Sequence, residues 1–149
     1  MDRNEAHAAL DAVAQTRSRM AETTQWPLWR HALFGVAETL FVIGISLPTL
    51  YFGISALLAF ALIIWLFTDD KKRYGMFVSG WHGQKPRLIT LGMTVVVVAL
   101  AGLSWTTRGE PVPAPLALLA GLATFIVCTL GSIWWQSAYK RELREAAAQ

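Results

Sequence analysis

Glu38 is the residue in this 149-residue chain whose type and position most directly predict chemistry. It lies inside a mostly apolar stretch, residues 28–47, where a carboxylate is energetically costly and by default indicates a functional site. His31 precedes Glu38 by seven residues, nearly two helical turns, so both side chains share one face of a helix. The spacing therefore predicts a line of titratable groups suited to a proton or cation site. The alternative is that Glu38 makes an interhelical hydrogen bond that fixes packing, within the chain or across a dimer.

Other residues that could do chemistry are few and scattered. His31 and His82 both lie near one predicted membrane surface, and two nearby histidines suggest a metal or haem site. Their spacing, however, matches no ligand pattern. The sequence contains no G-x-S-x-G, HExxH, CxxC or Walker lysine motif. We therefore predict no cofactor, no bound metal and no enzymatic activity. A membrane enzyme or haem protein that uses the two histidines is kept as an alternative.

Four long apolar stretches account for the composition, in which 54% of the residues are hydrophobic and only 15% are charged. They cover residues 28–47, 50–67, 88–105 and 114–135. Each has the length of a membrane-spanning helix, and none alternates polar and apolar residues as a barrel strand would. Only a helix satisfies every backbone group within such a segment. The sequence therefore predicts an all-α integral membrane protein built as a four-helix bundle.

The remaining segments divide into a leading helix, two loops and a tail. Residues 1–26 are predicted to form a cytoplasmic amphipathic helix and linker. Its narrow apolar stripe could dock a partner protein or a second copy, or the helix could lie solvated beside the membrane. The transmembrane domain is predicted at 27–139, with a cytoplasmic loop at 68–87 and an outer loop at 106–113. Residues 140–149 form a cytoplasmic tail.

Basic residues are distributed very unevenly between the two ends of the predicted spans. Of the 13 Lys and Arg residues, Arg108 alone falls on the side opposite to the other twelve. By the positive-inside rule, both termini are predicted to be cytoplasmic, in a multi-pass protein of the plasma (inner) membrane. The lipid bilayer is then the first partner. The same distribution explains the net charge of +3, so no nucleic-acid partner is predicted.

Two further sets of residues indicate contacts with other helices, lipid headgroups or a partner protein, and not catalysis. The fourth stretch carries small or weakly polar side chains at steps of three and four, which is typical of close helix packing. These are Ala117, Gly121, Thr124, Cys128 and Ser132. The cytoplasmic loop carries basic and aromatic side chains that would contact anionic lipid headgroups or a protein partner, or would serve topology alone. These are Lys71, Lys72, Arg73, Trp81, Lys85 and Arg87.

The start of the chain resembles a known group of proteins. The motifs are the segment 9–13 (ALDAV), Arg17 with Arg19, and the segment 26–29 (WPLW). Followed by four spans, this pattern is similar to a family of small uncharacterised bacterial membrane proteins. The resemblance covers the first third of the chain by motif and the rest by topology. It implies a bacterial plasma membrane and transfers no functional residues.

These observations leave three hypotheses for function. The first is a non-enzymatic membrane protein that acts by association, as an accessory or regulatory subunit or as a homo-oligomer. It rests on the small-residue face, the basic loop and the cytoplasmic helices. The second is a small transporter or channel subunit with Glu38 as its intramembrane proton or cation site. The third is the membrane enzyme or haem protein that uses His31 and His82.

Overall fold

The structure is a computed structural model that describes residues 26–74, 84–112 and 114–147, and the single positions Glu5, Ala12 and Gln15. Its helices are α2 (Leu28–Ser46), α3 (Thr49–Tyr74), α4 (Gln84–Trp105) and α5 (Pro115–Ala147). No strand occurs within the described ranges, so the prediction of an all-α fold is confirmed. The predicted cytoplasmic helix of residues 1–26 lies almost entirely outside the described residues.

All four helices are long and apolar enough to cross a membrane. Much of their apolar surface faces outward, since only 17% of the most apolar part of α3 and 11% of that of α4 are buried. An apolar surface of this extent is unusual on a monomer in water, whereas the hydrocarbon of a bilayer solvates it. The four helices therefore indicate a membrane protein.

Three of the helices extend beyond the predicted spans at one end of the bundle. α3 continues to Tyr74, α4 begins at Gln84 with Pro86 in its first turn, and α5 runs to Ala147. The apolar stretches mark the part suited to hydrocarbon, but a helix can continue into water wherever its side chains allow. The first turn of α4 tolerates Pro86 because backbone N–H groups there have no partner within the helix.

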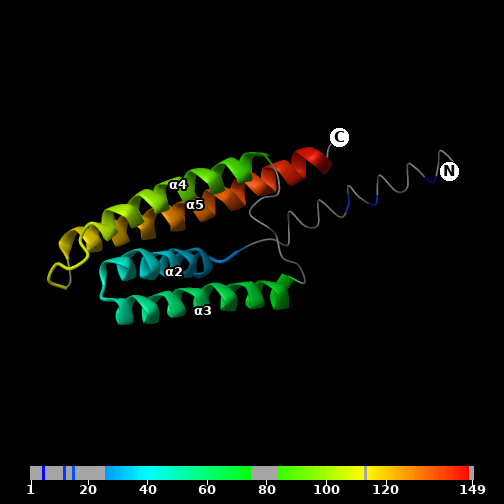
Figure 1. Cartoon of the computed structure of the whole chain (residues 1–149). Coiled ribbons are helices and arrows are strands. Elements are labelled where there is room, and N and C mark those ends of the chain that lie inside the picture. The colour runs from blue at the N-terminus through cyan, green and yellow to red at the C-terminus, as the bar shows by residue number, and fades with distance from the viewer. Residues whose placement is uncertain are drawn as a thin grey trace.

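α2 is the central helix of the bundle (Figure 1). It packs against α3, α4 and α5, whereas α3 packs mainly on α2 and makes no comparable contact with α4 or α5. The turn between α2 and α3 and the loop between α4 and α5 lie at the same end of the bundle. The helices lie as two pairs, α2 with α3 and α4 with α5, and the contact of α2 with α5 between the pairs is the most extensive in the bundle.

Small side chains bring α2 close to its neighbours. A Cβ on Gly44 would overlap Ser55 of α3, and a Cβ on Gly121 of α5 would overlap Ile43 of α2. Thr39 reinforces the second contact, because its hydroxyl donates a hydrogen bond of 3.1 Å to the Gly121 carbonyl. Close approach of this kind drives helix association in hydrocarbon, where apolar side chains gain nothing by leaving lipid.

α4 is held by both α2 and α5. The buried Ser104 hydroxyl donates a hydrogen bond of 2.6 Å to the Val42 carbonyl of α2. Met93 packs over Gly131 of α5, where a Cβ would overlap the thioether. These contacts fix α4 beside α5 and away from α3, which leaves room for a cavity between the two pairs of helices.

Candidate functional site

Glu38 lines a cavity of about 430 Å³ to which all four helices contribute. Most of the lining is apolar or aromatic, for example Phe34 of α2, Ile63 of α3, Met93 of α4 and Trp135 of α5. A smaller hollow of about 250 Å³ between α2 and α3 also reaches Glu38. The carboxyl therefore lies near the middle of α2, at a place where the helices do not close tightly around it.

Glu38 has no hydrogen-bond or ion-pair partner within the part of the chain that the structure describes. The other charged residue that lines the cavity is Arg30, and its guanidinium is bound by Asp70. Cys128 is the remaining titratable side chain in the lining. An isolated carboxylate in such surroundings is strongly disfavoured, so Glu38 needs either a proton or a bound cation.

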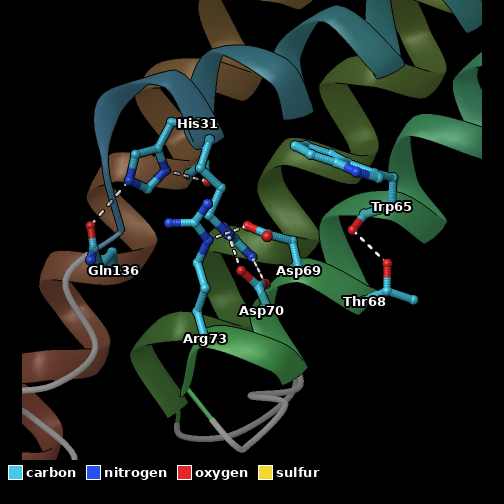
Figure 2. A network of polar contacts seen from close by, with 9 residues as sticks. His31, Trp65, Thr68, Asp69, Asp70, Arg73 and Gln136 are labelled. Atoms are coloured by element: carbon cyan, nitrogen blue, oxygen red, sulfur yellow. Dashed lines mark hydrogen bonds and ion pairs between the residues drawn. The ribbon is translucent and has the colours of Figure 1, made fainter.

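His31 lies on the same helix as Glu38 but is buried against α5. Figure 2 shows the His31 ring pointing toward Gln136. Its Nε2 lies 3.1 Å from Oε1 of Gln136, and its Nδ1 lies 2.8 Å from the Ser132 hydroxyl. An amide oxygen only accepts, so Nε2 carries the hydrogen and Nδ1 of the neutral ring accepts the Ser132 hydroxyl. Both ring nitrogens are engaged in this arrangement. The prediction places His31 and Glu38 in one line of titratable groups. In the structure the two side chains have separate surroundings, and of the two only Glu38 lines the cavity.

Arg30 connects the start of α2 to the end of α3. Its Nε donates a hydrogen bond of 2.7 Å to Oδ1 of Asp70, and a second guanidinium nitrogen donates to Oδ2. Two-point arginine–carboxylate pairs are among the strongest hydrogen-bonded pairs in proteins. Both side chains are mostly buried, with 14% of Arg30 and 6% of Asp70 exposed. The neighbouring pair of Arg73 and Asp69 is more exposed and lies within α3.

Aromatic rings stack beside this ion pair. Trp26 and Trp135 have ring centres 5.5 Å apart and planes that differ by 6°, and Trp135 stacks in turn on Tyr139 at 5.3 Å. The guanidinium carbon of Arg30 lies 3.6 Å from the centre of the Trp26 ring, a cation–π contact. Trp26, Arg30 and Trp135 also line the cavity. The stack therefore forms the cavity wall at the end of the bundle where Arg30 pairs with Asp70, which we call the charged end.

The small-residue face predicted on the fourth span is buried inside the chain. Ala117, Thr124 and Cys128 are at most 1% exposed, Ser132 is 9% exposed, and Gly121 is covered by α2. Cys128 and Ser132 also contribute to the cavity lining. This face packs α5 against other helices of the same chain, so it is not available to a second copy.

The predicted headgroup contacts fall at the charged end of the bundle. Five of the six residues are described, and all five are exposed: Lys71, Lys72 and Arg73 end α3, and Lys85 and Arg87 begin α4. The backbone N–H of Lys85 donates a hydrogen bond of 2.8 Å to Glu142, and its ammonium lies 3.7 Å from Glu145. Trp81 and His82 lie outside the described residues. Exposed basic side chains are thus present where headgroups would be met.

Glu38 belongs to no cluster of metal-ligating side chains among the described residues. Among the residues that the structure describes, no three His, Cys, Asp or Glu side chains come together to hold a metal ion. The sequence did not reveal that Arg30 pairs with Asp70 or that His31 meets Ser132 and Gln136. A signal was present in Asp70, an acidic residue that follows the second apolar stretch within a basic run. Choosing its partner requires knowing that α3 lies beside α2.

Comparisons with protein-family models, with curated proteins and with solved structures found no match. The resemblance to small bacterial membrane proteins therefore stays a prediction. Function has to be inferred from the geometry of the bundle and its cavity.

Proposed function

We propose that this protein is the binding unit of a small membrane transporter or channel, in which Glu38 holds either a proton or a cation. The observation that supports this most directly is a carboxyl without a partner among the described residues, in a largely apolar cavity of about 430 Å³. A proton and a cation compensate the same carboxylate, so they exclude one another. Such exclusion is what an exchanger requires.

The proposal includes an orientation in the membrane. Both termini are cytoplasmic, in the inner membrane of a bacterium, which is supported by the twelve basic residues grouped on one side of the predicted spans. Lys71, Lys72 and Arg73 then lie at the cytoplasmic surface, where they meet anionic lipid headgroups. The stack of Trp26 and Trp135 lies just inside this surface, between the cytoplasm and the cavity.

Association between copies is a second candidate function, favoured by the outer face of α4. A Cβ on Gly92 or Gly102 would meet no atom of the described residues within 4 Å, and Ala99 is exposed on the same helix. Small residues that face outward let another membrane helix approach closely. A homo-oligomer or an accessory subunit would use this face in place of the buried face of α5. Two or more copies would also give an ion a longer path than one cavity does.

Proton movement across liposome membranes tests the first proposal. Wild type and the Glu38→Gln variant are reconstituted around a trapped pH-sensitive dye, and inward gradients of Na⁺, K⁺, choline or tetraphenylphosphonium are imposed in turn. At least one cation should drive proton movement by the wild type, and the variant should be slower by at least about tenfold because the competing carboxylate is gone. Equal rates for the two proteins would overturn the proposal.

A matched control uses Glu110, an exposed carboxyl in the loop between α4 and α5. Glu110→Gln removes the same charge far from the cavity and should keep the wild-type rate. Tryptophan fluorescence and gel filtration of each variant report whether the bundle is folded, since Trp26 and Trp135 stack only when α2 and α5 are packed together.

A further inference from the structure

We infer that the cation taken up at Glu38 is a hydrophobic organic cation, and that it enters from the bilayer between α3 and α4. This inference rests on the proposed function and names its ligand class and its route. It draws on the composition of the cavity, the position of its opening and the charges around Glu38.

The lining disfavours a small inorganic cation. Such an ion must exchange its hydration shell for several oxygen ligands, as in channel filters lined with carbonyl groups. Beside Glu38 the cavity offers mainly the hydroxyls of Thr90, Thr94 and Ser132. Thr90 and Thr94 donate hydrogen bonds to carbonyls of their own helix, and Ser132 is bonded to His31. Donation leaves lone pairs on these oxygens, but the three hydroxyls and the two oxygens of Glu38 are at most five side-chain ligands, fewer than the roughly six oxygens that an ion such as Mg²⁺ takes.

The same lining suits an organic cation with a large apolar surface. Phe34 and Phe67 present aromatic rings, and Met93 adds a polarisable thioether. The stacked rings of Trp26 and Trp135 add apolar surface. Aromatic faces attract cations, and the effect is larger where water is excluded. The volume of about 430 Å³ lies in the range of pockets that hold small organic ligands.

We place the opening of the cavity on the outer side of the bundle, between α3 and α4. Its side walls come from α3 and α4, which make little contact with each other. One lining residue on each of these helices is also exposed: Val98 of α4 is 65% exposed and Phe67 of α3 is 42% exposed. At the charged end, Trp26, Arg30 and Trp135 form the wall. A ligand dissolved in hydrocarbon therefore meets the opening directly.

The charges around Glu38 favour a cation. α3 and α4 contribute no titratable side chain to the lining, α5 contributes the thiol of Cys128, and α2 contributes Arg30, which Asp70 neutralises. Among the described residues, the carboxylate of Glu38 thus supplies the net charge of the site. Protonation of Glu38 removes that charge, so binding should weaken as the pH falls.

Binding of tetraphenylphosphonium to the purified full chain in detergent tests both parts of the inference. Wild type should bind it, with weaker binding of tetramethylammonium and none of Na⁺. Glu38→Gln should weaken binding by at least about tenfold through loss of the counter-charge. Val98→Trp should fill the opening and weaken binding by about tenfold. Val95→Trp is the matched control, because Val95 lies on α4 at 68% exposure but does not line the cavity.

Each of the other outcomes overturns one part of the inference: the ligand class, the cation site or the lateral route. If tetraphenylphosphonium does not bind but Na⁺ or K⁺ drives proton movement that depends on Glu38, the ligand class is wrong and the proposed function stands. If it binds Glu38→Gln as tightly as wild type, binding is apolar only and the cation site is wrong. If Val98→Trp and Val95→Trp both bind as wild type does, the lateral route is wrong.

Discussion

Arg30 of α2 and Asp70 of α3 are 40 positions apart in the sequence and form a two-point ion pair at the charged end of the bundle. The next residue, His31, is bonded to Ser132 and Gln136 of α5. Two successive residues of the central helix are therefore connected to two different helices. Because α3 packs mainly on α2, the ion pair of Arg30 and Asp70 is positioned to hold the end of α3 in place.

Replacement of Asp70 by Ala should lower the free energy of unfolding by about 3 kcal/mol, because Arg30 keeps a mostly buried charge without its partner. Titration with a denaturing detergent, followed by tryptophan fluorescence, measures the change. Asp69→Ala is the control, since it removes an exposed pair within one helix and should cost about 0.3–0.5 kcal/mol. Equal losses for the two variants would contradict the assignment of Arg30 and Asp70 as a structural link.

Replacement of His31 by Leu should also destabilise the fold, by about 2–3 kcal/mol, because Ser132 and Gln136 keep buried polar groups that have lost a partner. Adding Ser132→Ala to His31→Leu should recover part of the loss, since one unpaired hydroxyl is then removed. The same unfolding titration measures both steps. Ser137→Ala, at an exposed position of α5, should have little effect. A double variant less stable than His31→Leu would show that Ser132 has another role.

Replacement of Gly121 by Leu should disrupt packing within a single chain and not only between chains. Any side chain there overlaps Ile43, and overpacking of this kind costs about 1–3 kcal/mol or more. Gly92→Leu is the contrasting variant, because a Cβ there meets no described atom within 4 Å. It should leave the unfolding titration unchanged. Native mass spectrometry of Gly92→Leu then tests association directly, since loss of an oligomer would place the contact on α4.

Replacement of Glu38 by Leu should stabilise the bundle while removing cation binding. A carboxylate within a span is disfavoured by about 2.5–3.5 kcal/mol on insertion scales, and no described partner offsets this cost. The unfolding titration and the mass of the complex in mild detergent measure the two consequences. Lower stability together with loss of an oligomer would instead identify Glu38 as an interface hydrogen bond, which is the alternative that the sequence leaves open.

The four spans could be predicted from the sequence because length and apolar composition are sufficient to recognise them. The helix ends were less accessible, since Asp69 to Tyr74 and Gln84 to Arg87 are polar segments that continue a helix without any apolar signal. Glu38 was visible as the charge inside an apolar stretch. Its cavity was not, because the cavity depends on α3 and α4 remaining apart, which is a property of packing.

The contacts of His31 also could not be predicted from the sequence. His31 was recognised as a candidate on its own helix, but its partners Ser132 and Gln136 lie 101 and 105 positions away. Spacing within one helix predicts which side chains share a face and cannot predict which helix that face meets. The small-residue face of α5 was identified by this spacing, and only the packing of α2 determines that it is used within the chain.

The central place of α2 has a consequence for biogenesis. The apolar span of α2 is the least hydrophobic of the four spans, and the residues that satisfy its polar side chains are synthesised later. Asp70 arrives with α3, but Ser132 and Gln136 arrive only when α5 has been made. A nascent chain that has made three of these helices therefore still lacks the Ser132 and Gln136 partners of His31, near one predicted membrane surface. A product truncated before α5 would therefore keep His31 without the contacts that it makes in the folded chain.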